Sequence, residues 1–119
     1  MAKRIMVVDD AAFMRMRCKK FLAAQGYEVA EAATGKEAVQ KYRETRPDAV
    51  FLDITMPDMD GLTALGEIMS INPRARVAML TAMGQQSIVI SALKAGARDF
   101  VVKPFDEQRV LSAVQKLLG

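Results

Sequence analysis

The sequence predicts an α/β fold in which a five-stranded parallel sheet is covered on both faces by five helices, a three-layer doubly wound sandwich. Short apolar runs alternate with longer amphipathic segments, and the runs are too apolar to face water on either side. Right-handed crossovers between parallel strands lead to the doubly wound arrangement. No linker rich in Ser, Gly or Pro interrupts the pattern, so we expect residues 1–119 to form a single domain.

The strands are predicted from the apolar runs, and the helices from the segments between and after them. Short apolar runs bounded by polar or turn residues are typical of buried strands. The predicted strands span residues 4–8, 27–30, 49–52, 76–80 and 100–102. The predicted helices span residues 11–25, 36–45, 62–70, 85–95 and 106–118.

The first helical segment has one apolar and one charged face. The apolar positions recur at helical spacing and are Met14, Cys18, Phe21 and Leu22. The basic residues on the opposite side are Arg15, Lys19 and Lys20. Because Cys18 lies in the apolar stripe, we expect its thiol to be buried and unreactive.

Cap and turn residues mark the ends of later elements. Gly26 and Gly96 follow the first and fourth helical segments, where a residue with positive φ is favoured. Asp60 and Asp106 precede the third and fifth, where an N-cap is favoured. Gly66 interrupts the third helical segment, at a cost of about 1 kcal/mol relative to Ala.

The fourth helical segment carries more apolar residues than one buried stripe needs. They are Ile88, Val89, Ile90 and Leu93. We expect a wholly buried helix face here, with a surface for an output partner as the alternative. The nine methionines are also interpreted mainly as packing residues, with Met6, Met69 and Met79 in the core.

Composition excludes several classes of protein. The net charge of +3 is scattered and lacks interleaved aromatic residues, which argues against binding to nucleic acid. No apolar run approaches the roughly 20 residues needed to cross a bilayer, and the first run is too short for a signal peptide, so we expect a cytoplasmic protein without membrane insertion. The absence of histidine excludes serine–histidine triads and histidine phosphocarriers within this chain.

Polar side chains follow four of the five predicted strands. Asp9 and Asp10 follow the first, Asp53 the third, Thr81 the fourth and Lys103 the fifth. In a parallel sheet these positions share the carboxyl edge, where open α/β folds form their ligand crevice. Each residue alone could be a helix cap, a turn residue or a solvated side chain. Three acids at one edge, however, repel one another.

A hard divalent cation would remove this repulsion. Oxygen donors without His or Cys suit Mg²⁺ or Mn²⁺ and not zinc. The chemistry that fits is phosphoryl transfer to a carboxylate, with Asp53 as nucleophile and the Asp9 and Asp10 pair as metal ligands. Lys103 would neutralise phosphoryl oxygens, and the Thr81 hydroxyl would donate a hydrogen bond.

Four motifs, "VVDD", "LDITMPDMDG", "LTAMG" and "VVKPF", resemble in order and spacing the receiver domains of two-component response regulators. The resemblance covers the whole chain and is strongest to the stand-alone chemotaxis members of the family. It implies a flavodoxin-like fold with strand order 2-1-3-4-5. It also implies a signalling switch and not an enzyme, one that catalyses only its own phosphoryl transfer and dephosphorylation.

The resemblance assigns roles around the predicted metal site. Asp53 would be the phosphoacceptor and a metal ligand, Asp10 a direct Mg²⁺ ligand and Asp9 a mainly water-mediated one. The backbone carbonyl of Thr55 would complete the protein ligands. In the family, the side chain at the position of Thr55 tunes dephosphorylation, which leaves the lifetime of the phosphorylated state open.

The resemblance also implies a switch. Lys103 would contact the phosphoryl group and precede a cis peptide bond to Pro104. Thr81 would move toward the phosphoryl oxygens and Phe100 would turn inward with it, which couples the chemistry to the face formed by the fourth helix, fifth strand and fifth helix. The family often has Tyr where this chain has Phe100. Because Phe100 has no hydroxyl for an output contact, only the packing part of the switch remains.

The expected partners are proteins. A histidine kinase would supply the phosphoryl group, and the face of Arg15, Met16 and Lys19 is its candidate docking site, with a merely solvated face as the alternative. Because the chain ends with the fifth helix, we expect no attached output domain and therefore signalling by contact with a target such as a flagellar motor switch component. We also expect a monomer. A phosphatase is a further expected partner.

Other functions remain open from the sequence. A phosphorelay intermediate, or a receiver cut from a longer regulator, would share all of these motifs. A Mg²⁺-dependent phosphohydrolase of the haloacid dehalogenase type also uses an Asp nucleophile after a strand, but its motif requires a second Asp where this chain has Thr55. A flavodoxin-like nucleotide binder would need a Gly-rich loop after the first strand, and none is present.

Overall fold

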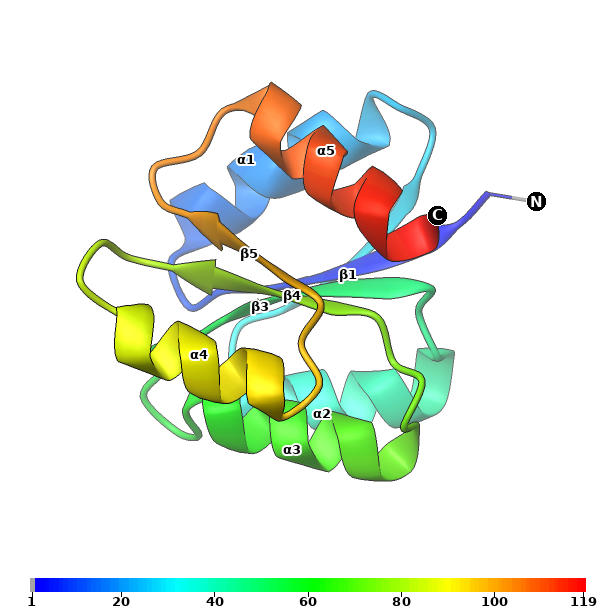
Figure 1. Ribbon diagram of the computed structural model, residues 1–119. Coiled ribbons are helices and arrows are strands. Elements are labelled where there is room, and N and C mark those ends of the chain that lie inside the picture. The colour runs from blue at the N-terminus through cyan, green and yellow to red at the C-terminus, as the bar shows by residue number, and fades with distance from the viewer. Residues whose placement is uncertain (1) are drawn as a thin grey trace.

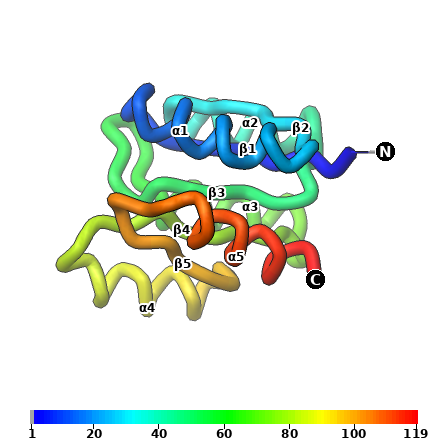
Figure 2. Tube along the Cα trace, turned by 90° about the horizontal axis from the view of Figure 1, so that it is seen from above, coloured from blue at the N-terminus to red at the C-terminus, as the bar shows by residue number. Residues whose placement is uncertain are grey.

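Five parallel strands form the middle layer of the computed structural model, which describes residues 2–119 (Figure 1). The strands are β1 (Arg4–Val8), β2 (Glu28–Ala32), β3 (Ala49–Asp53), β4 (Val77–Thr81) and β5 (Asp99–Val102). Figure 2 shows them from above, in the order β2-β1-β3-β4-β5. This order confirms the one implied by the resemblance, and it places β3 at the centre of the sheet.

Five helices cover the two faces of the sheet. They are α1 (Ala12–Ala23), α2 (Gly35–Thr45), α3 (Gly61–Ile71), α4 (Gln86–Lys94) and α5 (Glu107–Leu118). Helices α1 and α5 lie on one face, and α2, α3 and α4 lie on the other (Figure 1). The predicted three-layer sandwich is therefore confirmed. No helix of the part of the chain that the structure describes is long and apolar enough to cross a membrane.

The strand ends differ slightly from the prediction. The sequence predicts the second strand at residues 27–30, whereas β2 extends to Ala32, because pairing of Glu31 with Val7 continues the ladder beyond the apolar run. Asp53 and Thr81, expected just beyond their strands, are the last residues of β3 and β4. Backbone pairing therefore positions both side chains directly.

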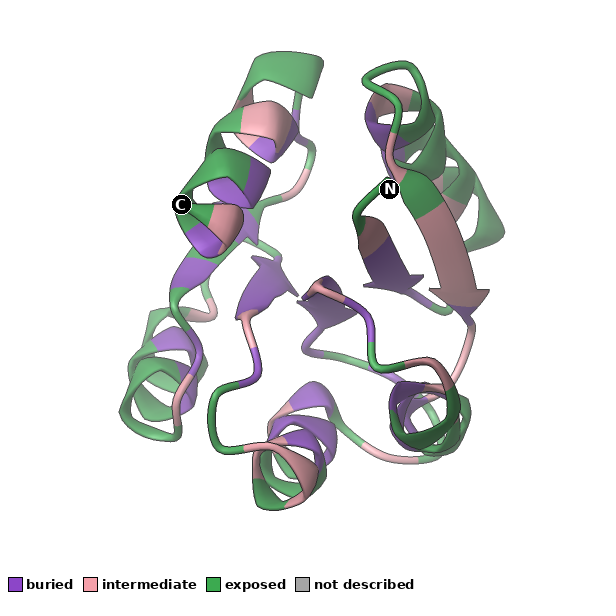
Figure 3. Ribbon diagram, turned by 90° about the vertical axis from the view of Figure 1, so that its right-hand side faces the viewer, coloured by how far each residue is buried: buried purple, intermediate pink, exposed green. Residues whose placement is uncertain are grey.

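Side chains pack in two layers, one on each face of the sheet. Successive strand residues point to opposite faces, so Ile5 packs with α1 and α5 while Met6 packs with α2, α3 and α4. Figure 3 shows the helices with exposed outer sides around buried central strands, whereas the edge strand β2 is mostly of intermediate burial. Met6 and Met79 are core residues as predicted, whereas Met69 is only half-buried. Cys18 is buried as predicted, and burial raises the pKa of its thiol to about 12.

The predicted helix ends are supported by local geometry. The Asp60 and Asp106 side chains accept hydrogen bonds from the backbone N–H groups of Thr63 and Arg109, so each caps its helix. Gly26 and Gly96 have φ values of 88° and 120°, in the left-handed region that glycine tolerates. These four predictions are confirmed.

The predicted wholly buried face of α4 is wrong. Val89 is buried, but Ile88, Ile90 and Leu93 are exposed. The reason is that α4 covers the sheet beside β5, at its edge, next to α3 and away from α2 on that face (Figure 1). The surplus apolar residues therefore form a surface.

Candidate functional site

The predicted site residues gather at the carboxyl edge of the sheet. Asp53 ends the central strand β3, opposite Leu80 of β4. The backbone N–H of Asp9 donates to the carbonyl of Ala32 at 3.1 Å, and that of Lys103 donates to the carbonyl of Thr81 at 2.7 Å. These bonds continue the ladder beyond the strands, so the backbone fixes where each side chain starts.

Three carboxylates meet at this edge. One oxygen each of Asp9, Asp10 and Asp53 lies within 4.8 Å of the others. Asp9 and Asp53 are buried, whereas Asp10 is exposed to solvent. Oδ1 of Asp9 accepts a hydrogen bond of 2.9 Å from the N–H of Ala11, which orients its carboxylate at the start of α1. The predicted convergence of the acids is observed.

Lys103 brings a positive charge to the carboxylates. Its Nζ lies 2.6 Å from Oδ2 of Asp9 and 3.2 Å from Oδ1 of Asp53. Burial alone would lower the pKa of Lys103, but contact with Asp9 and attraction by Asp53 outweigh burial and raise this pKa above its ordinary value. Lys103 is therefore a fixed cation within the acidic cluster.

The acceptor candidate has a perturbed carboxyl group. Burial, followed by repulsion from Asp9, raises the pKa of Asp53 from 3.8 to about 6. Attraction by Lys103 and a hydrogen bond from the backbone of Thr55 oppose this rise only in part. At neutral pH the Asp53 carboxylate is still mostly ionised, but a further positive charge would stabilise it.

The cluster fits a hard divalent cation. Oδ2 of Asp9 is buried, and within residues 2–119 its one polar contact is the Lys103 ammonium at 2.6 Å. The available donors are carboxylate oxygens, which suit Mg²⁺ or Mn²⁺. Three carboxylates beside a single ammonium carry an excess of negative charge, which such a cation would stabilise.

The structure also removes two ordinary explanations for these residues. The N-cap of α1 is Ala11 and that of α4 is Gln85, so neither Asp10 nor Thr81 caps a helix. Thr81 is buried at the end of β4. Both residues lie at the site without a capping role.

Thr55 lies in the loop after β3, and its side chain contacts a residue that the sequence analysis missed. The Thr55 hydroxyl oxygen accepts a hydrogen bond of 3.0 Å from Nε2 of Gln85. The amide oxygen of Gln85 in turn accepts from the N–H of Ala82 at 2.7 Å. Gln85 thus connects the start of α4 to the loop beside Asp53. The metal-ligand role of the Thr55 carbonyl stays a prediction.

Gly61 is a second missed residue. Its N–H donates to the carbonyl of Ile54 at 2.6 Å, and a Cβ here would lie 2.7 Å from Cα of Ile54 and would also meet the carbonyl of Asp53. The missing side chain therefore lets the start of α3 pack against the backbone that carries Asp53. The signal in the sequence for this role was the position of Gly61 directly after Asp60, the predicted N-cap of the third helix.

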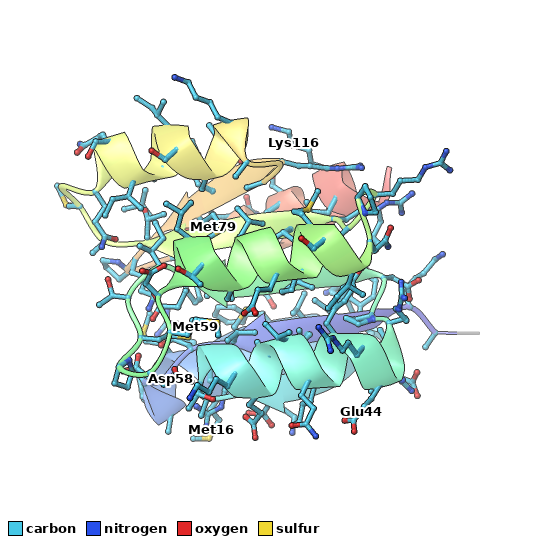
Figure 4. The ribbon with its side chains drawn as sticks, turned by 90° about the horizontal axis from the view of Figure 1, so that it is seen from below. Met16, Glu44, Asp58, Met59, Met79 and Lys116 are labelled. Atoms are coloured by element: carbon cyan, nitrogen blue, oxygen red, sulfur yellow. The ribbon has the colours of Figure 1, made fainter. Side chains whose placement is uncertain are left out.

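Asp58 fixes the same loop on its other side. Its carboxylate accepts hydrogen bonds from the N–H groups of Gly35 and Lys36, at 3.0 and 3.1 Å. Figure 4 shows Asp58 and Met59 beside the first turn of α2. The loop between β3 and α3 is thus attached to two helices.

The predicted switch residues lie next to the site. The cis bond between Lys103 and Pro104 is present. Phe100 on β5 is 38% exposed, and with Thr81, Ile90 and Val102 it lines an apolar cavity of about 360 Å³ against α4. In this structure the Phe100 ring therefore contributes to the surface and does not occupy the inward position implied for the activated state.

Comparison with known proteins agrees with this geometry. The sequence model of the response regulator receiver domain matches residues 5–115, and the chain belongs to this family. The Chemotaxis protein CheY of Bacillus subtilis (strain 168) is 60% identical over 120 residues, which cover 100% of both chains. That of Thermotoga maritima is 56% identical over 118 residues, which cover 98% of both.

A solved structure of the same kind shares the fold. The CheX-CheY-BeF3-Mg+2 complex from Borrelia burgdorferi contains a chain that matches with a TM-score of 0.94 and 38% identity, covering 98% of this chain and 90% of that one. The protein is therefore a CheY-like receiver domain of two-component signalling. These relationships favour a signalling switch over a phosphohydrolase of the haloacid dehalogenase type.

Proposed function

We propose that Asp53 accepts a phosphoryl group from a phosphohistidine of a partner kinase. A carboxylate oxygen of Asp53 forms a bond to phosphorus while the P–N bond to the histidine breaks, and the imidazole nitrogen keeps the electron pair and is protonated. The observation that carries this proposal is the meeting of three carboxylates within 4.8 Å beside the Lys103 ammonium.

The surrounding residues have separate tasks in this proposal. Mg²⁺, with Mn²⁺ as a substitute, would be held by Asp9, Asp10, Asp53 and the Thr55 carbonyl, and supplies positive charge that neutralises phosphoryl oxygens. Lys103, already 3.2 Å from Asp53, would contact a phosphoryl oxygen once Asp53 carries the phosphoryl group as an acyl phosphate. The Thr81 hydroxyl donates a hydrogen bond to another phosphoryl oxygen.

The exposed apolar surface of α4 and β5 is the proposed output face. Ile90 and Leu93 of α4 lie beside Phe100 and Val102 of β5, and all four are exposed. Inward movement of Phe100 with Thr81 would reshape this face. The names of the high-identity relatives support a role in chemotaxis. We propose a flagellar motor switch component as the target of this face. The CheX-CheY complex supports a phosphatase as a further partner.

The proposed kinase-docking face on α1 keeps Met16 of the predicted set and shifts toward Phe13. Arg15 and Lys19 are bound to Glu31 at 3.2 and 3.0 Å, so their charges connect α1 to β2. Phe13 and Met16 are 68% and 61% exposed. We therefore place the centre of the kinase-docking surface at Phe13 and Met16. We further propose that residues 1–119 form a single receiver domain that is monomeric and cytoplasmic.

Intact mass spectrometry after incubation with acetyl phosphate and Mg²⁺ tests the proposal. Wild type should gain one phosphoryl group per chain, and Asp53→Asn should gain none. Glu44→Gln is the matched control, because Glu44 is an exposed acid at the other end of α2 from Asp58 (Figure 4). Labelling of Asp53→Asn at the wild-type level would overturn the assignment, and steady turnover without a labelled chain would favour an enzyme.

A further inference from the structure

A second polar cavity lies at the end of the sheet opposite the acidic cluster. It has a volume of about 380 Å³. Its lining includes Lys3, Asp48 and Arg76, which precede β1, β3 and β4, together with residues at the ends of α2 and α3. Residues that precede parallel strands share the amino edge, so we call this hollow the amino-edge cavity. Figure 3 looks at the molecule from the side on which the N-terminus lies.

The amino-edge cavity concentrates positive charge. Its four basic residues are Lys3, Arg46, Arg74 and Arg76, and its one carboxylate is Asp48. Oδ2 of Asp48 is already engaged, because it accepts a hydrogen bond of 2.8 Å from the N–H of Arg4. The side chains that line the cavity therefore carry more positive than negative charge.

None of the four basic side chains forms an ion pair or a side-chain hydrogen bond within residues 2–119. The guanidinium of Arg46 lies over the Tyr42 ring, at 5.9 Å from its centroid. Some basic residues elsewhere are matched, as Arg109 is with Asp99, whereas others, such as Arg17 and Lys20, form no ion pair and are exposed on α1. The cavity thus holds cations that the fold does not use internally.

The negative ends of two helices offset only part of this positive charge. The C-terminal ends of α2 and α3 lie here and each carries about half a negative charge. The last intrahelical bonds run from the backbone N–H groups of Arg46 and Asn72 to the carbonyls of Tyr42 and Ile68, so the carbonyls beyond them carry this partial charge. Two helix ends and Asp48 together offset about two of the four positive charges. A surplus of roughly two remains.

We propose that the amino-edge cavity binds a small polyphosphate anion of the pyrophosphate class. Guanidinium groups present paired N–H donors that match phosphate oxygens, and three of the four cations are arginines. Tyr42, the aromatic residue of the lining, is buried, so the cavity offers no exposed ring for stacking on a base. The site therefore recognises the diphosphate group, whether free or part of a nucleotide.

Calorimetric titration of inorganic pyrophosphate into the full chain tests the proposal. The experiment uses metal-free buffer at about 150 mM salt, where the Debye length of about 8 Å screens diffuse attraction. Arg74→Gln combined with Arg76→Gln should weaken binding at least about tenfold. The control, Arg17→Gln with Lys20→Gln, removes the same charge from the exposed face of α1 and should change the affinity less than about twofold.

Three results would overturn the proposal: no heat of binding with wild type, equal loss in both double variants, or binding of ADP without binding of pyrophosphate. Comparable affinities for ADP and pyrophosphate would support recognition of the diphosphate group. Lys3→Gln, a single exposed change, repeats the test if the double variant does not fold. Labelling of Asp53 by acetyl phosphate should persist in Arg74→Gln with Arg76→Gln, so this proposal and the proposed function fail separately.

Discussion

The ammonium of Lys103 lies 2.6 Å from Oδ2 of Asp9, a buried oxygen that has no other polar partner within residues 2–119. The same ammonium is 3.2 Å from Asp53. Lys103 therefore acts as the internal counter-ion of two buried carboxylates. Breaking a buried ion pair is costly because it leaves an uncompensated charge in a poorly solvated place.

Lys103→Met should destabilise the metal-free protein by about 1–3 kcal/mol at neutral pH, because the Asp9 and Asp53 carboxylates would then repel each other without a cation. Urea denaturation in EDTA measures this. Lys116→Met is the matched control, since Lys116 is 3.9 Å from Asp99 and well exposed (Figure 4), and it should change stability by less than about 1 kcal/mol. Equal effects of the two substitutions would contradict the counter-ion role.

Asp53→Asn should stabilise the metal-free protein at pH 7. The pKa of Asp53 is raised from 3.8 to about 6, so between these values the folded state binds a proton that the unfolded state has released. The contribution of this proton to the free energy of unfolding is fully present below pH 3.8 and is lost as pH rises through about 6. Because asparagine does not titrate, the free energy of unfolding of the Asp53→Asn variant does not fall in this way as pH rises.

Melting temperatures from pH 4 to pH 8 in EDTA test the prediction. The Asp53→Asn variant should melt a few degrees higher than wild type at pH 7, consistent with roughly 1–2 kcal/mol, and the difference should shrink toward pH 4. A constant difference across the range would show that the carboxyl group of Asp53 does not titrate as described. Glu44→Gln should leave the wild-type pH profile unchanged.

Asp10→Asn should abolish the stabilisation of the protein by millimolar Mg²⁺. A ligand at ten times its Kd stabilises the folded state by about 1.4 kcal/mol, so wild type should melt at a higher temperature when Mg²⁺ is added. Asp10 is exposed, and its substitution should leave the metal-free melting temperature nearly unchanged. An unaltered Mg²⁺ response in Asp10→Asn would exclude it as a ligand.

The acidic cluster at the carboxyl edge was predictable from the sequence because strand ends share one edge of a parallel sheet. Asp9, Asp53 and Thr81 follow or end apolar runs, and the topology brings them together without long-range detail. The hydrogen bond from Gln85 to Thr55 was not predictable, because it joins loops 30 residues apart whose conformations depend on packing. Sequence periodicity carries no information on such contacts.

The faces of helices were predicted less well than their positions. The apolar residues of α4 suggested burial, but α4 lies near the β5 edge of the sheet, so Ile90 remains exposed. Likewise, the sequence placed Arg15 on the charged face of the first helix but did not indicate its ion pair with Glu31 on β2. In both cases a sequence pattern gives a helix two faces but does not say which neighbour lies against each.

Gly66→Ala should stabilise the protein by about 1 kcal/mol, because Gly66 is exposed inside α3 and Ala has the higher helix propensity. A Cβ at Gly66 would meet no atom within 4 Å. Gly61→Ala is the matched contrast in the same helix, since its Cβ would meet the backbone of Asp53 and Ile54. It should destabilise the protein by at least about 2 kcal/mol.

Two measurements on each alanine variant, the urea midpoint and the labelling by acetyl phosphate, test this prediction. Together they distinguish an effect of helix propensity from an effect of the contact with β3. Gly66→Ala should label as wild type does, because its position is solvent-exposed. Gly61→Ala should label less, since relief of the clash requires movement of the backbone that carries Asp53. Normal labelling and stability in Gly61→Ala would show that the loop adapts freely, and the close approach of α3 to β3 would then have no role in positioning the acceptor.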